Sequence, residues 1–517
     1  MVKWFNVKGL CIPSKHYMVD ITDRLKKMKR LVDREEYFVI NRGRQYGKTT
    51  TLSQLRSFIC TEYIVIFLNF QGFGTASFTN EKNFCQKFFK ELQKSLQISK
   101  NDQLEEMNSL NDLDDYITKI CKDQKVVLMI DEVDRASNYR VFLDFLGILR
   151  TKFQARTDGF DFTFHSVILA GVYDIKNLKM KMIKEGVYVP TNEERGNESP
   201  WNIAENFAEE MAFSASEIAG MLDCYEADHH TFMDTSDIAE EIYSFTSGYP
   251  FLVSRICQYI DEKLDKNWSR AGVKEAVRLI TEEPQPNTLF DDLFKNIRNN
   301  EELARFLREI LLEGEIYQFS QGVEVIEQGL RYAFIRIMDR TVVIHNKIFA
   351  IIITSYFITK EKLEAKKLVK NSIMADVVSG DQLNIELFFE KFRAHYKREY
   401  GDRDERFLER EATFLFLFFL QPYLNGKGFY YFESKPNHAT GKRMDVVVTY
   451  GITEFIIELK VWKGPSQQEK AYNQLTDYMT HRGADKGYLL TFDFRKTKEE
   501  KQEWLQIDGV DILEVQV

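Results

Sequence analysis

The first part of the chain alternates short apolar runs with longer amphipathic stretches. The apolar runs are rich in β-branched and aromatic residues and lie at Phe38–Ile40, Tyr63–Asn69, Val126–Ile130 and Ser166–Ala170. Such runs predict buried strands. Helical periodicity before the first run and between the later ones predicts helices over Ile21–Val32, Glu81–Leu96, Asp102–Cys121 and Phe142–Phe153. Strands that alternate with helices predict a parallel sheet with helices on both faces.

The middle of the chain predicts mainly helices. Helical patterns cover Ala204–Met211, Ala215–Cys224 and Thr235–Thr246. Gly248 and Pro250 then mark a turn into the next helix. Further on, a helix at Leu303–Leu312 precedes short apolar runs at Glu315–Phe319, Ala333–Ile337 and Val342–His345. This order is typical of a winged helix, and a charged helix over Thr359–Lys370 leads into the last part of the chain.

Composition and charge narrow the class of protein. The 517 residues are too many for one core, and 44% hydrophobic with 29% charged residues is ordinary for a soluble folded protein. A net charge of −9 excludes a protein that coats nucleic acid with its whole surface, so any such contact needs a local patch. The 6 cysteines are scattered, which argues against a zinc site or a disulfide framework.

Nothing in the sequence predicts a membrane partner. The N-terminal residues lack the apolar core of a signal peptide. The most apolar stretch, Ala412–Leu424, is too short to span a bilayer and fits a buried helix. We therefore expect a cytoplasmic protein.

A candidate phosphate-binding loop follows the first strand. Gly47-Lys48-Thr49 comes after Phe38–Ile40 and opens a predicted helix, the layout of a P-loop. The full pattern requires a glycine where Arg42 stands, and Gly43 comes one place late. The alternative is a plain turn that starts a surface helix.

An acidic pair ends the third predicted strand. Asp131 and Glu132 follow Val126–Ile130, at the strand end where open α/β sheets place their chemistry. In a P-loop enzyme the first carboxylate orders Mg²⁺ and the second polarises the attacking water; the alternative is helix capping. Asp174 and Arg150 are weaker candidates for sensing the γ-phosphate, with surface ion pairing the simpler interpretation. His16 and Tyr17 either cover a nucleotide base or pack.

Five sequence blocks occur in order: HYM, YFVINRGRQYGKTTTL, VVLMIDEVD, SPWNI and GYPFLV. Together they resemble bacterial AAA-type ATPases of the signal-transducing (STAND-like) kind over roughly residues 10–275, several of which have the same loosened P-loop. The resemblance implies ATP and Mg²⁺ as cofactors. Thr49 and Asp131 would serve the metal, Glu132 the water, and Pro250 would lie against the base. The phosphate-binding loop would comprise Gly43, Gln45, Tyr46, Gly47, Lys48, Thr49 and Thr50.

A second set of candidate residues lies near the C-terminus. Asp445 heads a run of valines, and Glu458 and Lys460 alternate on the next predicted strand, so both point to one face. Metal-dependent nucleases use two carboxylates to hold the metal, and a lysine orients water or stabilises developing charge. Charged residues alternate on many half-exposed strands, but here the neighbours on nearly all sides are apolar: Phe455, Ile456, Ile457, Leu459 and Val461. A Glu and a Lys are costly there unless paired or metal-bound.

The order of these residues resembles the PD-(D/E)XK nuclease fold, including the version fused to AAA-type ATPases. Met444 stands where the family's proline would be. The resemblance implies that Asp445 and Glu458 bind Mg²⁺ or Mn²⁺ and that Lys460 is catalytic. Glu411 would lie near the metal, and Gln474, four residues before Tyr478 on a predicted helix, would contact substrate. A basic cluster either contacts phosphate or is a solvated loop: Lys435, His438, Lys442 and Arg443.

These observations predict an α/β protein: a P-loop sheet with a helical lid and winged helix, then a smaller restriction-endonuclease-like domain. The boundaries are 1–195 for the ATPase core, 196–275 for the lid, 276–358 for the winged helix, 359–383 for a helical linker and 384–517 for the nuclease-like domain.

The predicted function is an ATP switch that controls a nuclease, with DNA expected rather than RNA. Defence against mobile DNA is an indirect expectation, because hosts tolerate such a nuclease only if it is gated. The alternative is a nucleotide-regulated scaffold whose nuclease fold only binds nucleic acid. A DNA translocase is disfavoured because neither an arginine finger nor a pore loop can be identified. Self-association into a homo-oligomer stays open.

Overall fold

The structure is a computed structural model of the 517-residue chain. It describes residues 3–96, 107–136, 139–172, 201, 203–207, 210–282, 287–312, 315–364, 376–380, 382–400, 409–424, 427–433, 445–493, 495 and 501–517. By compactness the chain divides into two units. The first comprises Met1–Asp228, Tyr249–Ser254 and Arg331–Ala333, and the second comprises His229–Gly248, Arg255–Leu330 and Phe334–Val517.

The first unit is built on a parallel sheet with the strand order β2-β3-β4-β1-β5. Its strands are β1 (Phe38–Asn41), β2 (Ile64–Asn69), β3 (Val126–Asp131), β4 (Ser166–Gly171) and β5 (Glu205–Asn206). The first four confirm the strands predicted from the sequence. β3 and β4 are buried along their whole length, as expected for strands covered on both faces.

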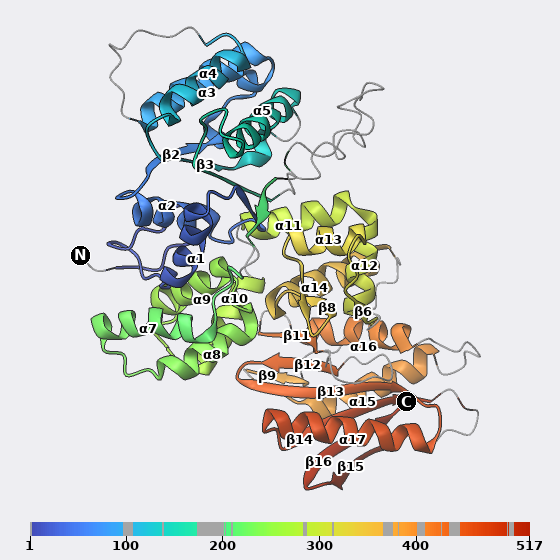
Figure 1. Ribbon diagram of the computed structural model, residues 1–517. Helices are drawn as coiled ribbons and strands as arrows, with labels where there is room; N and C mark the ends of the chain where they lie inside the picture. Colours follow the sequence, from blue (N-terminus) through green and yellow to red (C-terminus); the bar gives the residue numbers. More distant parts are fainter. Residues whose placement is uncertain are drawn as a thin grey trace, which may run out of the picture. The chain divides into compact units, whose positions relative to one another are not determined.

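Helices cover both faces of this sheet (Figure 1). They are α1 (Thr22–Asp33), α2 (Lys48–Ile59), α3 (Glu81–Ser95), α4 (Leu110–Cys121) and α5 (Arg140–Thr157). Leu128 and Ile130 of β3 join a core with α3, α4 and α5, whereas the alternate residue Met129 is buried outside that core. This alternation along one strand separates the two faces, and α1 and α2 lie on the second.

The helix predicted at Ala204–Met211 is wrong. The backbone N–H groups of Glu205 and Phe207 donate to the carbonyls of Tyr37 and Val39 at 2.7 and 2.9 Å, which makes β5 the edge strand beside β1. Ala204, Phe207 and Met211 are each 3% exposed. Their spacing imitates a helix, but pairing with the open edge of β1 determines the backbone.

Four helices follow: α7 (Ala215–His229), α8 (Thr235–Thr246), α9 (Pro250–Lys263) and α10 (Arg270–Glu282). The first three confirm the predicted helices. Ser247 and Gly248 both have positive φ, 46° and 72°, and thus form the predicted turn between α8 and α9. Within the second unit, Arg270 of α10 forms a bidentate ion pair with Asp237 of α8.

The segment predicted as a winged helix contains the expected strands and two further helices. It comprises α11 (Thr288–Asn299), α12 (Glu301–Leu312), β6 (Tyr317–Gln318), α13 (Glu324–Arg331), β7 (Ile335–Met338), β8 (Thr341–Ile344) and α14 (Lys347–Glu364). The three strands form a sheet in the order β6-β8-β7. The charged helix predicted at Thr359–Lys370 begins as the end of α14, and its remainder lies outside the described residues.

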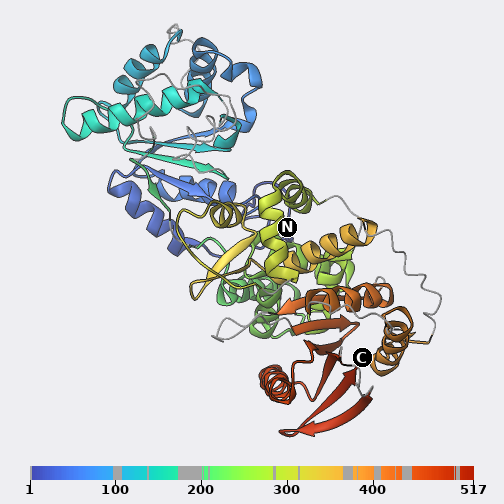
Figure 2. The same ribbon diagram turned by 90° about the vertical axis from the view of Figure 1, so that its right-hand side faces the viewer.

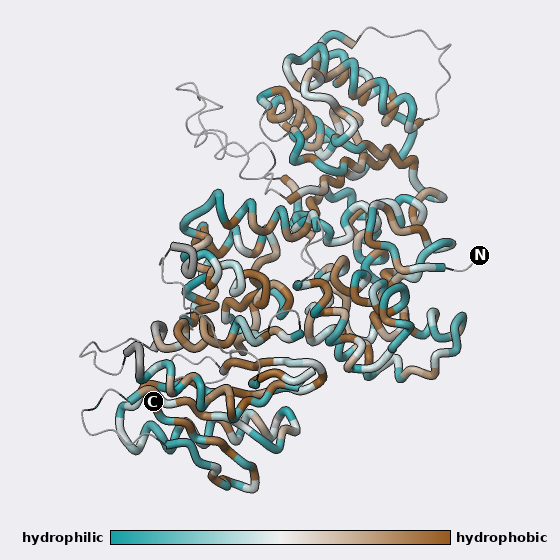
Figure 3. The backbone as a smooth tube through the Cα atoms, turned by 180° about the vertical axis from the view of Figure 1, so that it is seen from behind, coloured by the Kyte–Doolittle hydropathy of each residue, from teal (hydrophilic) through white to brown (hydrophobic). Residues whose placement is uncertain are grey.

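The C-terminal part contains a mixed sheet in the order β11-β12-β13-β14-β16-β15. Its strands are β11 (Gly428–Glu433), β12 (Asp445–Tyr450), β13 (Thr453–Val461), β14 (Lys486–Phe492), β15 (Lys501–Ile507) and β16 (Val510–Gln516). A two-stranded ladder precedes it, β9 (Val378–Ser379) with β10 (Gln382–Leu383). β13, β14 and β16 are parallel to one another, and the remaining neighbours are antiparallel. Much of strands β12 to β14 is hydrophobic (Figure 3).

Three helices cover the two faces of this sheet: α15 (Ile385–Tyr400), α16 (Glu409–Leu424) and α17 (Pro465–Arg482). Phe389 and Phe392 of α15 pack on Tyr488 and Phe492 of β14. Gln468 of α17 bonds instead to Thr491, whose side chain points to the other face. α17 thus lies on one face, with α15 and α16 on the other (Figure 2).

The sequence-based prediction omitted the hairpin of β15 and β16, although its signal was present. Asp508 and Gly509 connect the strands, and both have positive φ, 50° and 84°. Asp-Gly between alternating strands is a strong hairpin signal. Within the part of the chain that the structure describes, no helix has the length and apolarity needed to cross a bilayer.

Candidate functional site

The loop between β1 and α2 has the backbone shape of a phosphate-binding loop. Gln45 and Gly47 have positive φ, 54° and 81°, and Lys48 begins the helix directly after Gly47. An L-residue is strained at φ near 81°, so a glycine suits position 47. The N-terminus of α2 therefore faces the loop interior with its backbone N–H groups unused by the helix.

Lys48 lies inside this loop and is 7% exposed. Its Nζ donates to the carbonyl oxygens of Arg42 and Gly43 at 2.9 and 2.8 Å. Burial lowers the pKa of Lys48, while the negative charges of Asp134, Glu132 and Asp131 oppose that shift. The ammonium group is thus held among acceptors at the mouth of the loop.

Thr49 and Asp131 meet as the sequence predicts. The Thr49 hydroxyl donates to Oδ2 of Asp131 at 2.6 Å, and the backbone N–H of Glu132 donates to Oδ1 of the same carboxylate at 2.9 Å. Asp131 is completely buried at the carboxyl end of β3. A hydroxyl beside a carboxylate supplies the hard oxygen donors that Mg²⁺ prefers, so these residues fit the metal that a P-loop ATPase uses.

Glu132 has an unusual backbone conformation for its residue type, with φ at 55°. Burial raises the pKa of its carboxyl group, and the charge of Lys48 partly opposes that rise. A carboxyl group with a raised pKa accepts a proton more readily, which suits a group that polarises water.

The contacts of Arg42 and Gly43 account for the departure from the usual loop pattern, in which a glycine stands at position 42. The backbone N–H of Arg42 donates to the carbonyl of Gly171 at 3.1 Å, so Arg42 extends the pairing of β1 with β4. A Cβ atom at Gly43 would lie 3.0 Å from the carbonyl oxygen of Tyr332 and 3.1 Å from Cβ of Ala333. The glycine at 43 therefore permits close packing of the 331–333 segment against the loop.

Tyr46 connects the loop to the start of α9. Its hydroxyl donates to Oε1 of Glu210 at 3.2 Å, and its ring packs edge-on against Tyr249 at 4.8 Å. The Tyr249 hydroxyl donates to the carbonyl of Arg44 at 2.5 Å. Pro250 begins α9 next to this tyrosine pair and is buried.

The remaining predicted residues of the first unit have described contacts of their own. The Thr50 hydroxyl accepts a hydrogen bond from the Cys11 N–H at 3.3 Å. His16 accepts one from the Ile12 N–H at 2.8 Å, and Tyr17 donates to Asp228 at 2.9 Å and packs against Tyr225. His16 and Tyr17 thus pack within the unit.

Asp134 is a residue of this site that the sequence reasoning missed. Its Oδ2 accepts a hydrogen bond from the Val172 N–H at 2.7 Å, just beyond β4. Its charge is also the largest attraction acting on Lys48. The signal was the second aspartate of the run Asp131-Glu132-Val133-Asp134. Arg150 lies on α5, and Asp174 lies outside the described residues.

The second candidate site lies on β12 and β13. The register pairs Asp445 directly with Glu458, and Lys460 follows two residues later on the same face. Glu458 is completely buried, and the Lys460 side chain is 19% exposed. Nζ of Lys460 lies 2.5 Å from Oε1 of Glu458, so the ion pair that the apolar strand requires is present.

Helix α17 covers the face of the sheet that carries these residues. Glu458 pairs in register with Leu489, and Lys460 pairs with Thr491, which Gln468 of α17 contacts at 3.2 Å. On the same helix, Oε1 of Gln474 is buried and has no hydrogen-bond partner within the described residues. Tyr478, one turn later, is 3% exposed.

Several predicted residues of this site are only partly described. Glu411 lies in the first turn of α16, and Asp445 begins β12, but the side chains of both are outside the described residues. The basic cluster lies wholly outside them: Lys435, His438, Lys442 and Arg443. Among the side chains that are described, no group of three or more His, Cys, Asp or Glu residues could hold a metal ion. The fit to a divalent metal therefore rests on the paired register of Asp445 and Glu458 and on the hard oxygen donors they supply.

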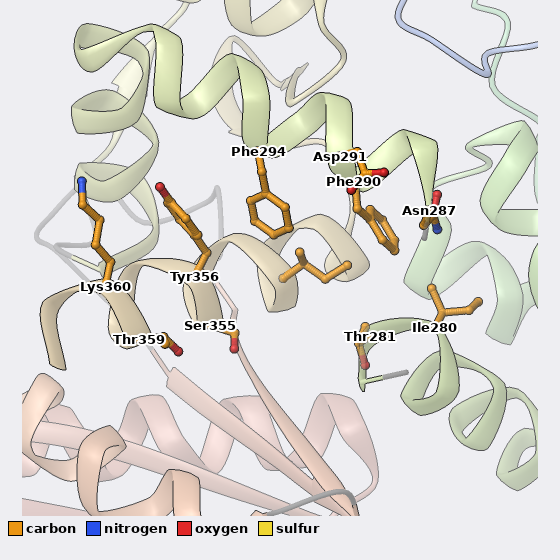
Figure 4. A pocket seen from close by; sticks show the side chains of 11 residues that line it. Ile280, Thr281, Asn287, Phe290, Asp291, Phe294, Ser355, Tyr356, Thr359 and Lys360 are labelled. Carbon is orange, nitrogen blue, oxygen red and sulfur yellow. The ribbon is translucent and has the colours of Figure 1, made fainter. Parts of the chain in front are cut away.

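The second unit contains a cavity of about 510 Å³ that lies apart from the residues predicted for the two candidate sites. Figure 4 shows its walls, in which Phe294 of α11 lies beside Tyr356 of α14 and Phe290 lies further along α11. Ile280 and Thr281 of α10 close one end. None of the residues predicted for either site lines it.

A family model of an AAA-like domain matches residues 14–349. The chain belongs to this AAA-like family. The match includes the loop at Lys48 and the acidic pair after β3, so the chain is a P-loop ATPase, and nucleotide with Mg²⁺ is the cofactor such a fold implies. The match ends in α14, so the AAA-like domain does not account for the mixed sheet that carries Glu458 and Lys460.

Three of the solved structures that are similar to this chain are the following. The Walker-type ATPase PABY2304 of Pyrococcus abyssi is 13% identical over 68% of this chain and 99% of its own, with a TM-score of 0.45. Cdc6p from Pyrobaculum aerophilum is 13% identical over 69% and 98%, with a TM-score of 0.34. The ORC2 protein of Aeropyrum pernix is 12% identical over 65% and 94%, with a TM-score of 0.38. No curated protein matches the sequence.

Proposed function

We propose that this AAA-like ATPase is a nucleotide-controlled switch for a metal-dependent phosphodiesterase in its C-terminal domain. The observation that carries the proposal is the Glu458–Lys460 ion pair of 2.5 Å on an apolar strand, opposite Asp445 in register. A fully buried carboxylate is costly unless a partner or metal compensates it. A surface strand with an accidental Glu-x-Lys pattern would not need to bury the Glu.

In the ATPase part we assign phosphate binding to Gly47, Lys48 and the N–H groups that begin α2. Lys48 would leave its loop carbonyls to meet the terminal phosphates. Thr49 and Asp131 would hold Mg²⁺, and Glu132 would accept a proton from the attacking water. Pro250 would lie against the base. The other loop residues would shape the loop: Gly43, Gln45, Tyr46 and Thr50.

In the C-terminal part, Asp445 and Glu458 would hold Mg²⁺ or Mn²⁺ next to the scissile phosphate. Such a metal supplies Lewis-acid activation and charge neutralisation. Lys460 would orient the attacking water or stabilise the developing negative charge. Gln474 would contact the substrate, and Glu411 would approach the same site from α16.

We propose nucleic acid, DNA rather than RNA, as the substrate, and defence against mobile DNA as a role. The domain scheme with boundaries at 195, 275, 358 and 383 belongs to the same proposal. The rival is a scaffold whose C-terminal domain binds nucleic acid without cleaving it. The presence of the buried Glu458 with its lysine favours the enzyme, because binding nucleic acid without cleaving it does not require a buried carboxylate.

The test is incubation of the purified full-length protein with labelled DNA and RNA, with Mg²⁺ and with or without ATP. Cleavage by the wild type and its loss in Lys460→Ala supports the proposal. Lys470→Ala is the matched control, because Lys470 is an exposed lysine on α17. Equal cleavage by Lys460→Ala would refute the nuclease assignment, and binding without cleavage by the wild type would favour the scaffold.

A further inference from the structure

Trp462 lies on the same face of the sheet as the Glu458–Lys460 pair. Residues 458, 460 and 462 alternate along the chain, and the Trp462 N–H donates to the carbonyl of Phe492 at 2.8 Å. That bond continues the pairing of β13 with β14 one residue beyond Val461, so the alternation of side chains extends to Trp462. An indole therefore follows the lysine at the carboxyl edge of the strand.

Arg495 is fixed over the Trp462 ring by a buried aspartate. Asp493 is completely buried and receives Nε and Nη2 of Arg495 at 2.9 and 2.6 Å. Gln516 donates to the same carboxylate at 2.6 Å. The guanidinium carbon of Arg495 lies 4.4 Å from the centroid of the Trp462 ring.

The Arg495 guanidinium is held by the Asp493 carboxylate and is also accessible to solvent. Burial alone would raise the pKa of Asp493, but the hydrogen bonds from Arg495 hold it below its usual value, so the carboxylate stays ionised. Because Asp493 balances the charge of Arg495, the guanidinium contributes a flat surface more than a net charge. The Arg495 side chain is 50% exposed, so that surface reaches solvent.

We propose that Trp462 and Arg495 form a stacking platform for an unpaired nucleobase beside the Lys460 site. The platform rests on the proposed function and specifies its substrate class as single-stranded nucleic acid. Successive bases stack on aromatic and guanidinium planes with little dependence on sequence. A base within a duplex is already stacked on its neighbours and cannot use the platform. Lys460 and the exposed Lys463 flank the indole and suit the backbone phosphates.

The experiment measures binding of a fluorescent single-stranded 20-mer (about 20 nucleotides, to span one binding site) to the full-length wild-type protein, the parent, in EDTA, which withholds the metal that cleavage needs. Adding Trp462→Ala is expected to weaken binding roughly 5- to 150-fold, the range for loss of one stacked base. Trp462→Phe retains most of the affinity, and binding of the matched duplex changes little. Trp504→Ala is the control, because Trp504 is also a partly exposed tryptophan of this sheet, at 39%.

Thermal unfolding shows whether each variant is folded. If Trp462→Ala does not fold, the binding assay uses Arg495→Lys instead. In addition, quenching of Trp462 fluorescence by the oligonucleotide is measured in the parent. Equal single-strand affinity of parent and folded Trp462→Ala, or absence of single-strand binding by the parent, overturns the platform. The experiment needs no cleavage. Stacking without nuclease activity in the wild type would therefore remove the proposed function and leave the platform intact.

Discussion

The two candidate sites stabilise a buried carboxylate in different ways. Asp131 receives the Thr49 hydroxyl, from the start of α2, and the N–H of Glu132, the next residue after β3. Glu458 relies on a lysine two residues away on its own strand. The first site is assembled from a sequence-local loop and one distant strand. The second depends on strand register, because a slip of one residue would turn Glu458 and Lys460 to the other face.

This difference explains why the first site lies within a recognised family domain, whereas the second site has no short motif by which a family could be recognised. A loop motif fixes its own geometry, whereas two carboxylates on neighbouring strands become a site only when the sheet aligns them. The family match ends at residue 349, so the proposal for the C-terminal sheet rests on the sequence pattern, on the register of Asp445 with Glu458 and on the Glu458–Lys460 ion pair. Four variants test this difference between the two sites.

Glu458→Gln is expected to have the largest effect. The amide keeps the shape of the side chain but removes the charge that would hold the metal, so cleavage of labelled DNA should fall about 100- to 1,000-fold. Single-turnover cleavage in Mg²⁺ measures it. Glu469→Gln, at an exposed glutamate of α17, should cleave like the wild type. Full activity in Glu458→Gln would show that the buried pair is only structural.

Lys48→Ala should weaken ATP binding about 10- to 150-fold, because a charge-assisted bond to phosphate is worth roughly 1.5–3 kcal/mol. Titration with a fluorescent ATP analogue measures the affinity. The exposed Lys26→Ala should bind as the wild type does. Unchanged affinity in Lys48→Ala would mean that the loop at Gly47 does not bind the phosphates.

Gly43→Ala tests the packing that accounts for the altered loop. The added Cβ would lie 3.0 Å from the Tyr332 carbonyl oxygen, so the backbone must shift, at a cost of about 1 kcal/mol in the free energy of unfolding. Gly72→Ala is the matched control, since nothing lies within 4 Å of a Cβ there. Chemical denaturation compares the two. If Gly43→Ala is as stable as the control, the 331–333 segment moves to accommodate the added Cβ at no cost in the free energy of unfolding.

Glu132→Gln should have the smallest effect, a gain in stability whose size depends on pH. Burial raises the pKa of Glu132 above its ordinary value of 4.5, so the folded protein binds this proton more tightly than the unfolded chain. Ionisation of Glu132 therefore costs stability as pH rises through the raised pKa. At pH 7 the variant should melt at a higher temperature than the wild type, and the gain should vanish below about pH 4.5. A lower melting temperature at pH 7 would contradict the sign.

Much of the fold could be predicted because apolar spacing follows the period of each element. Strands β1 to β4 and helices α1, α3 and α8 lie close to their predicted bounds. β5 could not be recognised, because two backbone hydrogen bonds to β1 form it while its apolar residues keep a helical spacing. The hairpin of β15 and β16 was recognisable from Asp508-Gly509.

The candidate sites were predictable only where one segment contains the signal. Thr49 and Asp131 follow from a loop motif and an acidic strand end, and the structure brings them to 2.6 Å. The packing of Gly43 against Tyr332 and the stack of Arg495 on Trp462 join residues far apart in sequence. Such contacts depend on tertiary structure and leave no local pattern.

Cleavage of one labelled DNA substrate in Mg²⁺, with and without ATP, shows whether nucleotide controls the C-terminal domain. It compares the wild type, Lys48→Ala and Lys460→Ala. We predict that ATP changes the cleavage rate of the wild type, that Lys48→Ala cleaves at a rate independent of ATP, and that Lys460→Ala does not cleave. The same wild-type rate with and without ATP, or cleavage by Lys460→Ala at the wild-type rate, would contradict a nucleotide-controlled nuclease.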